Sequence, residues 1–233
     1  MAAVPPEPPR IDRPLAVVLL SGGMDSCVAA ALTLATHDLA LLHLSYGQRT
    51  EERERRAFHD LARHWGVERT LESRLDHLAA VGGSALTDAR RDAVHARRAG
   101  SDIPDTYVPF RNTHLLALAA SWGEVTGARR LVIGAVEEDG SGYPDCRAEY
   151  FEAFGRVLRL GTRPETDLEV STPVLHLSKA DIVRAGTRSG APFHLTWSCY
   201  TGQDVACGRC ESCCLRLKGF REAGIPDPLP YAR

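Results

Sequence analysis

The sequence predicts an α/β fold with a doubly wound, mostly parallel sheet and a small cysteine-rich appendage at its C-terminal end. Two observations predict it. Apolar runs of strand length alternate with helical segments in β-α-β-α-β order from residue 15 onward, which is the pattern of parallel sheets. Five of the seven cysteines lie between Cys199 and Cys214, which sets the tail apart from the sheet.

Most of the predicted strands are short apolar runs without polar alternation. Helices cover a parallel strand on both faces, so continuous apolarity is its signature. The helices follow from longer stretches with apolar residues at helical spacing or with many alanines. The strands are expected at Leu15–Leu20, Leu39–Leu44, Val67–Leu71 and Leu131–Ala135, and the helices at Asp25–Ala35, Glu51–Trp65, Asn112–Gly127, Arg147–Leu160 and Ser178–Ser189.

The remaining segments divide the chain into three parts. Residues 1–13 are proline-rich and polar and are expected to be a disordered lead-in. Residues 14–190 form the sheet domain, within which 73–106 are expected to be long loops with a short helix near 88–98. Residues 191–233 form the cysteine-rich subdomain.

The composition limits the possible classes of protein. The chain has 233 residues, of which 44% are apolar and 25% charged, enough for one sizeable domain with a real core. The net charge of −2 gives no excess of Lys and Arg, so nucleic acid is not an expected partner. No apolar run reaches the roughly 18 residues of a membrane span, and the N-terminus lacks the apolar centre of a signal peptide. We expect a cytoplasmic protein with no membrane partner.

The hexapeptide SGGMDS at Ser21–Ser26 stands between the first strand and the first helix. Its glycines, Gly22 and Gly23, permit positive φ and close approach of the backbone to a ligand. The N–H groups of the loop and of the helix start favour anionic oxygens, and the serine hydroxyls add donors. Asp25 near phosphates indicates a Mg²⁺ ligand or a helix cap. The alternative is a simple glycine turn with no ligand.

Other nucleotide motifs do not fit this loop, because it lacks both the Gly-Lys-Ser/Thr of a Walker loop and a Gly-x-Gly-x-x-Gly fingerprint. The hexapeptide instead resembles the SGGxDS pyrophosphate loop of the PP-loop ATP pyrophosphatases. That resemblance implies a Rossmann-like sheet of the adenine nucleotide α-hydrolase type. It also implies transfer of AMP to a carbonyl oxygen of the substrate, followed by displacement of AMP by a nucleophile.

The cysteine tail has the spacing of a metal site. Cys199, Cys207, Cys210 and Cys213 include two Cys-x-x-Cys steps, which suit a tetrahedral, structural Zn²⁺ site. An iron–sulfur cluster is the rival occupant. Cys214 competes with Cys213 for the fourth ligand position. The Cys-x-x-Cys spacing favours Cys213, which would leave Cys214 as a small buried apolar residue.

The loop and the tail together resemble the 7-cyano-7-deazaguanine synthase family, within the PP-loop superfamily. Five further motifs carry the likeness: YGQR from Tyr46, TYVPFRN from Thr106, YPDCR from Tyr143, LSKADIV from Leu177 and TWSCY from Thr196. The likeness covers nearly all of residues 15–220. Phe110 and Ala148 depart from the family pattern, where a small residue and a proline are usual, and they leave room for a paralogue with a different acceptor.

The resemblance implies a ligase reaction that forms a C–N bond. ATP adenylates the carboxylate of 7-carboxy-7-deazaguanine, ammonia displaces AMP to give the amide, and a second ATP activates the amide oxygen so that the nitrile forms. It implies ATP with Mg²⁺, a structural Zn²⁺ and a homodimer. The alternative is a paralogue that adenylates another acceptor: a tRNA base, another carboxylate, or a protein that receives the deazaguanine.

The resemblance also assigns residues to ATP and to catalysis. Ser21, Asp25 and Ser26 would hold pyrophosphate and Mg²⁺. Arg111 would reach phosphate or carboxylate, unless it forms a surface salt bridge. Asn112 would cap its helix or bind a ligand, and Lys179 would neutralise the adenylate unless it is solvated. Ser21, Asp25, Ser26, Arg111 and Lys179 are the expected catalytic residues, and ATP is expected on Leu19, Leu20, Ser21, Gly22, Gly23, Met24, Asp25, Ser26, Cys27, Val28, Tyr46, Gln48, Arg111, Asn112 and Gly134.

The substrate contacts are expected in the loop after the fourth strand, at the carboxyl edge of the sheet where ligands bind in open α/β folds. Asp145 is a candidate for the N–H edge of the guanine-like base. Cys146 is better read as a packing or substrate-contact residue than as a nucleophile, since no partner that would lower its pKa is evident. The expected substrate residues are Asp139, Tyr143, Asp145, Cys146 and Arg147.

Overall fold

The computed structural model describes residues 13–91, 103–137 and 142–232. In these residues a five-stranded sheet has the order β3-β2-β1-β4-β5, and every neighbouring pair is parallel. This confirms the predicted doubly wound sheet. The strands are β1 (Leu15–Leu19), β2 (Asp38–Ser45), β3 (Thr70–Arg74), β4 (Arg130–Ile133) and β5 (Glu169–Ser171).

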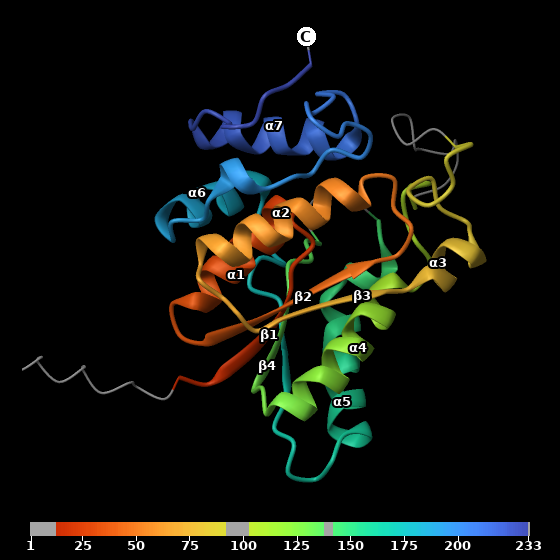
Figure 1. Ribbon diagram of the computed structural model, residues 1–233, viewed down its shortest axis with the longest axis vertical. Helices are drawn as coiled ribbons and strands as arrows, with labels where there is room; N and C mark the ends of the chain where they lie inside the picture. The colour runs from red at the N-terminus through yellow and green to blue at the C-terminus, as the bar shows by residue number, and fades with distance from the viewer. Residues whose placement is uncertain (1–12, 92–102, 138–141, 233) are drawn as a thin grey trace, which may run out of the picture.

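Helices cover both faces of the sheet, in two layers that Figure 1 shows above and below the strands. Alternate residues of the strands enter different cores, since side chains of a strand point to opposite faces. Val18 packs in one core with α1, α2 and α6, and Val17 in the other with α4 and α5. The helices are α1 (Met24–Leu34), α2 (Glu51–His64), α3 (Asp76–Val81), α4 (Arg111–Thr126), α5 (Ala148–Gly161), α6 (Lys179–Arg188) and α7 (Glu211–Ala223), with short 3₁₀ turns η1 (Pro144–Cys146) and η2 (Phe193–Leu195).

The strand order places a crevice between β1 and β4. From β1 the chain moves outward to β2 and β3, then returns across the sheet to β4 and β5 on the other side. Ligands of open parallel sheets bind outside the carboxyl ends of the strands at such a reversal of order. Leu20–Gly23 follow the carboxyl end of β1, and Gly134 follows that of β4. The fold therefore brings both segments to one place.

The cysteine-rich tail packs on the sheet domain through α7, which lies over α6 as the outermost layer in Figure 1. Gly219 makes this contact close, since a Cβ there would lie 2.7 Å from the Cβ of Lys179. Arg216 on α7 is almost completely buried and makes a two-pronged ion pair with Asp227, at 2.8 and 2.9 Å. It also donates to Thr196 Oγ1 and to the carbonyl of Phe193. One side chain thus connects three segments of the tail.

Several predicted elements differ from the structure. β3 lies at Thr70–Arg74 and not at Val67–Leu71, because this outer strand alternates between exposed and half-buried residues and gives no continuous apolar run. The three-residue strand β5 and the helices α3 and α7 were not predicted. The disordered lead-in and the possible helix at 88–98 lie largely outside the described residues. The predicted subdomain boundary near residue 190 remains a prediction. In the described part of the chain, no helix combines the length and apolarity needed to cross a bilayer.

The Arg216–Asp227 pair predicts a pH-dependent stability. Burial opposes ionisation, but the bonds from Arg216 hold the pKa of Asp227 below its ordinary value. Replacing Asp227 by Asn leaves a buried guanidinium without its counter-charge, and we expect a loss of about 3 to 5 kcal/mol in the free energy of unfolding at pH 7. A carboxylate whose pKa is lowered in the folded protein stabilises the fold at pH values above its ordinary pKa. The difference in free energy of unfolding between the wild type and the Asp227→Asn protein should therefore shrink as the pH falls below about 4.

Chemical denaturation of both proteins between pH 3 and 8 measures this difference. Asp60→Asn is the control, because its ion pair with Arg63 on α2 is exposed and should contribute little. An Asp227→Asn protein as stable as the wild type at pH 7 would contradict the assignment.

Candidate active site

The predicted phosphate loop adopts a conformation that requires one of its glycines. Gly22 has φ +87°, and a Cβ at this position would lie 2.7 Å from the carbonyl oxygen of Glu54 on α2. Gly23 has φ −78°, in the extended region, so it does not use the positive φ that a glycine permits. Gly23 is instead the N-cap of α1 and has no side chain with which to cap the first N–H groups of that helix, a helix start that suits an anionic ligand.

The two serine hydroxyls of the loop hold its shape. Ser21 Oγ and Ser26 Oγ lie 3.0 Å apart, and Ser21 Oγ accepts from the backbone N–H of Gly23. Ser26 Oγ also lies 3.1 Å from the carbonyl oxygen of Gly23, to which it donates. The side chains of Cys27 and Val28 point into the core below α1, and with Gly22 they are the predicted ATP residues that do not line the cavity described below.

Gly134 lets the end of β4 approach the loop closely. A Cβ on this residue would lie 2.6 Å from the backbone nitrogen of Ser26 and 2.8 Å from the carbonyl carbon of Asp25. Both are backbone atoms that have no room to move. The predicted ATP residue Gly134 is therefore also the residue that allows β4 and the start of α1 to meet.

A lysine from α6 reaches the loop. Lys179 Nζ lies 2.8 Å from Asp25 Oδ2, and only 11% of the lysine side chain is exposed. The alternative of a solvated lysine is therefore wrong. Asp25 Oδ1 is buried and has no hydrogen-bond partner among the described residues. A buried carboxylate oxygen without a donor suits a cation, so Asp25 fits the expected Mg²⁺ at the phosphates.

These groups line one cavity of about 300 Å³ at the carboxyl edge of the sheet. It extends from the loop toward β2, the start of α4 and the start of α7. Twelve of the fifteen predicted ATP residues line it, together with Lys179, Tyr143 and Cys146. The twelve are Leu19, Leu20, Ser21, Gly23, Met24, Asp25, Ser26, Tyr46, Gln48, Arg111, Asn112 and Gly134.

Arg111 lies inside this cavity and not in a surface ion pair. Its guanidinium lies 5.4 Å from the centre of the Tyr46 ring, and its Nη1 donates to the Tyr46 hydroxyl at 3.0 Å. Its Nε is buried without a hydrogen-bond acceptor among the described residues. The cation is held in place by an aromatic ring and keeps a donor for an anionic ligand.

Asp145 has a different position from the one expected. Its carboxylate accepts from the backbone N–H of Asn112 at 2.9 Å, which caps the start of α4 from outside the helix. It is buried and does not line the cavity. Asn112 does not cap the helix with its own side chain, which donates to the Asp145 carbonyl and to Cys146 Sγ. The carboxylate predicted to face the guanine edge is thus engaged in structure.

The other residues of this segment divide between two places. Tyr143 lines the cavity and donates to Thr106 Oγ1 at 2.7 Å, and Cys146 lines it as a buried thiol. Burial raises the pKa of Cys146 to about 11, so the thiol is protonated at neutral pH and suits packing better than nucleophilic attack. Arg147 faces a smaller neighbouring pocket. Asp139 lies outside the described residues.

The sequence did not predict the contribution of the tail to the cavity. Trp197 donates its backbone N–H to the carbonyl of Gly22 at 2.8 Å, and Ser198 Oγ accepts from the N–H of Met24 at 3.5 Å. The motif TWSCY was the available signal, but it did not show where these residues lie. The other lining residues from the tail are Tyr200, Glu211, Ser212, Leu215 and Arg216.

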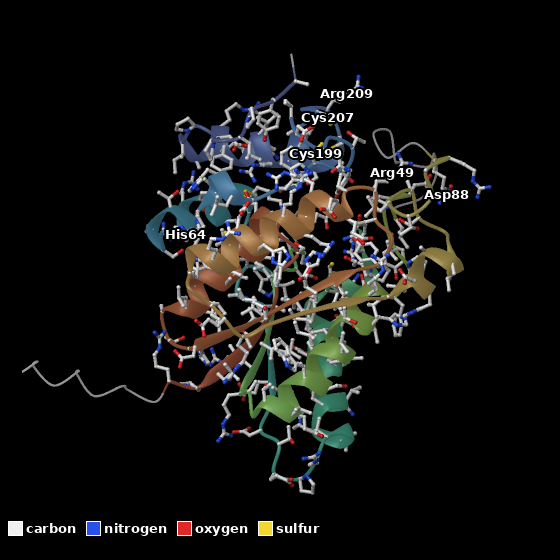
Figure 2. All side chains as sticks on the ribbon, in the orientation of Figure 1. Arg49, His64, Asp88, Cys199, Cys207 and Arg209 are labelled. Carbon is white, nitrogen blue, oxygen red and sulfur yellow. The ribbon has the colours of Figure 1, made fainter. Side chains whose placement is uncertain are left out.

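The four predicted metal ligands are assembled at the start of α7. The Sγ atoms of Cys199, Cys207, Cys210 and Cys213 all lie within 4.8 Å of one another. Figure 2 shows Cys199 and Cys207 next to each other on the outer side of the molecule. Three backbone N–H groups point at Cys199 Sγ, from Thr201, Gly202 and Cys207, as at a thiolate.

The cluster can hold a metal ion, and Cys214 is not part of it. The Cys214 side chain is exposed and lies 3.6 Å from the carbonyl oxygen of Arg209, so the expectation that it is buried is wrong. Cys213 is therefore the fourth cysteine of the cluster, as the Cys-x-x-Cys spacing predicted.

The comparisons with known proteins agree with this architecture. The family model described as queuosine biosynthesis protein QueC matches residues 15–224. The chain belongs to the QueC family. It is 52% identical over 219 residues to 7-cyano-7-deazaguanine synthase of Chlorobaculum parvum, covering 93% of this chain and 96% of that protein. It is also 52% identical over 224 residues to 7-cyano-7-deazaguanine synthase of Acidobacterium capsulatum, covering 94% and 97%.

Among solved structures, the chain overlaps with the U34-tRNA thiolase NcsA from Methanococcus maripaludis at a TM-score of 0.49 and 12% identity. The overlap covers 78% of this chain and 59% of that one. At this TM-score the overlap assigns no chemistry to the QueC-family chain.

The close approach at Gly134 predicts a specific loss of ATP binding. In a Gly134→Ala protein the added methyl group pushes the start of α1 away from β4, so the N–H groups of the loop no longer converge. We expect the Kd for ATP to rise at least about tenfold, because several charge-assisted hydrogen bonds weaken together. Isothermal titration with ATP and Mg²⁺ measures the change.

Gly155→Ala is the matched control, because a Cβ at this helical position would meet only the end of the Arg159 side chain at 3.9 Å. Its Kd should equal that of the wild type. Unaltered ATP binding by the Gly134→Ala protein would refute the role given to this contact.

Proposed function

We propose that this chain converts 7-carboxy-7-deazaguanine and ammonia into 7-cyano-7-deazaguanine at the expense of two molecules of ATP. The observation that carries the proposal is one cavity that is lined by the glycine loop, Lys179, Tyr143 and Cys146. Membership of the QueC family and about half identity to curated synthases over almost their whole length support the same reaction.

Adenylation comes first in the proposed reaction. A carboxylate oxygen of the substrate attacks the α-phosphorus of ATP, pyrophosphate leaves, and an acyl adenylate forms. The loop N–H groups and the hydroxyls of Ser21 and Ser26 bind the departing pyrophosphate. Mg²⁺ held by Asp25 would neutralise charge on the phosphates. Lys179 and Arg111 supply the other positive charges, so the protein contributes positioning and electrostatics, with no covalent intermediate on a side chain.

Displacement and dehydration complete the sequence. Ammonia attacks the acyl carbon, loses a proton and expels AMP, which gives the amide. The amide oxygen then attacks a second ATP at the α-phosphorus, with release of pyrophosphate. Loss of AMP carries away the oxygen, and loss of the two N–H protons leaves the nitrile. Each half uses the same transfer of AMP to oxygen, so one cavity serves both.

We propose a structural Zn²⁺ for the cysteine cluster. Four thiolates within 4.8 Å of one another leave no position for a substrate, and soft sulfur ligands in this spacing suit zinc. Because the same helix carries Cys213 and residues that line the cavity, the metal would stabilise the site without taking part in the reaction.

We also propose a cytoplasmic homodimer. The seven cysteines form no disulfide, as expected of a reducing compartment. The outer surface of α4 and α5 exposes Val125, Val157 and Leu160 to 76%, 57% and 87%. The two helices lie side by side, with Thr113 Oγ1 2.7 Å from the Tyr150 hydroxyl. Exposed apolar surface of this kind supports a contact between two copies.

The function is tested by direct turnover. Purified protein with ATP, Mg²⁺, ammonium and 7-carboxy-7-deazaguanine should yield the nitrile and AMP by mass spectrometry. Lys179→Met should lower kcat/KM by about 100-fold or more, because a cation aimed at developing charge is lost. Lys218→Met is the control, since Lys218 is exposed on α7 and should not matter. Absence of both nitrile and AMP from the wild-type reaction would refute the function, and AMP release with another acceptor alone would favour the paralogue.

Removal of one thiolate tests the metal site. Cys210→Ser should abolish stoichiometric zinc, measured by plasma mass spectrometry, and should lower the melting temperature and cause aggregation, because structural metal binding contributes to folding. Cys214→Ser, near the start of α7, is the matched control and should keep both metal and stability. A stable, active Cys210→Ser protein without metal would contradict a structural role of the metal. Detection of iron and acid-labile sulfide in the wild type would show that the cluster holds an iron–sulfur centre and not zinc.

A further inference from the structure

We propose that Glu211, the first residue of α7, recognises the amino-pyrimidinone edge of the substrate through its carboxylate. The inference rests on the proposed function and names a specificity-determining residue of that site. Nothing in the sequence pattern pointed to Glu211, which stands between two metal-binding cysteines. Its position follows from the fold, since α7 brings its first turn to the wall of the cavity.

The donors of the substrate require an acceptor. The edge of a deazaguanine presents a ring N–H and a 2-amino group side by side, and an ionised carboxylate accepts both with its two oxygens. Burial of such donors without acceptors is unfavourable, so a cavity that encloses the base must supply them. Asp145, the residue expected to do so, is engaged by Asn112 and lies outside the cavity lining.

Three carboxylates line the described part of the cavity: Asp25, Glu54 and Glu211. Asp25 stands at the phosphate loop in contact with Lys179. Glu54 has both oxygens occupied, Oε1 by Thr50 Oγ1 at 2.7 Å and Oε2 by Gln48 Nε2 at 3.0 Å. Neither oxygen of Glu211 accepts a hydrogen bond from any described residue. Glu211 alone among the three therefore has its full acceptor capacity available.

The surroundings of Glu211 suit a flat base. Glu211 lines the same cavity as the rings of Tyr143 and Tyr200. Tyr46, Tyr143 and Tyr200 all line the cavity, with Arg111 against Tyr46. Tyrosine rings give a planar heterocycle apolar contact. The glycine loop and Lys179, in another part of the same cavity, contribute N–H donors and a positive charge.

This arrangement orients the substrate. The carboxyl group of the substrate is on the five-membered ring, and the amino-pyrimidinone edge is on the six-membered ring. With the edge on Glu211, the carboxyl group can face the positive groups and the α-phosphate. A reversed base would place its carboxylate beside that of Glu211, which like-charge repulsion disfavours. Glu211 thus selects both the base and its direction.

A structural role is the competing explanation, since a glutamate in the first turn also interacts favourably with the helix dipole. Substrate binding separates the two. In a Glu211→Gln protein the Kd and KM for 7-carboxy-7-deazaguanine should rise about 10- to 100-fold, as for a lost charge-assisted pair, while the KM for ATP stays unchanged. Zinc content and melting temperature should equal those of the wild type.

The decisive comparison uses an analogue without the 2-amino group, 7-carboxy-7-deazahypoxanthine. The wild type should bind the acid at least about tenfold more tightly than the analogue, and the Glu211→Gln protein should bind the two within about threefold. Glu222→Gln on the exposed face of the same helix is the matched control and should keep the wild-type preference. A Glu211→Gln protein that retains the wild-type preference would overturn the assignment.

Two further measurements test the role of Glu211 independently of the proposed reaction and of the folding of α7. The Kd comparison needs no turnover, so a wild type that binds the acid without converting it would refute the function alone. Glu211→Asp retains the charge at the helix start and withdraws it by one methylene. It should keep the metal and weaken binding of the acid several-fold, and unaltered binding by this protein would also count against Glu211.

Discussion

The backbone bond from Trp197 N–H to the Gly22 carbonyl, at 2.8 Å, joins the cysteine-rich tail to the phosphate loop. Gly22 can accept it because its positive φ turns the loop back against α2. Arg216 holds the segment just before Trp197 through Thr196 and Phe193, and Asp227 neutralises Arg216. The cavity therefore depends on the tail as much as on the sheet, and the cysteine cluster lies at the start of the helix that supplies one wall of the site.

Charge is distributed unevenly within the cavity. N–H donors and Lys179, which meets Asp25, lie at the loop, and Arg111 lies against Tyr46. Tyrosine rings and the Glu211 carboxylate form the wall supplied by β2, the segment before α5, and the tail. A triphosphate and a flat base with N–H donors have the complementary distribution. The buried thiol of Cys146, whose pKa is about 11, fits a site that works by positioning and not by covalent attack.

Local sequence predicted most of the fold where burial leaves a repetitive pattern. Strands β1, β2 and β4 are covered on both faces, so their apolar runs were continuous and easily recognised. The outer strands β3 and β5 are half-exposed and give no continuous apolar run, so β3 was predicted three residues too early and β5 was not predicted. Helix α7 was missed because two of the clustered cysteines lie at its start and interrupt the usual signals.

Residues that are neighbours along the chain were enough to predict the glycine loop with its serines, and the Cys-x-x-Cys spacing that selects Cys213. Which carboxylates line the cavity became known only from the packing of the whole chain. Asp145 follows the predicted substrate segment but turns to α4, whereas Glu211, far along the chain, reaches the cavity. The physical reason is that the direction of a side chain depends on packing between elements distant in sequence, which no local spacing encodes.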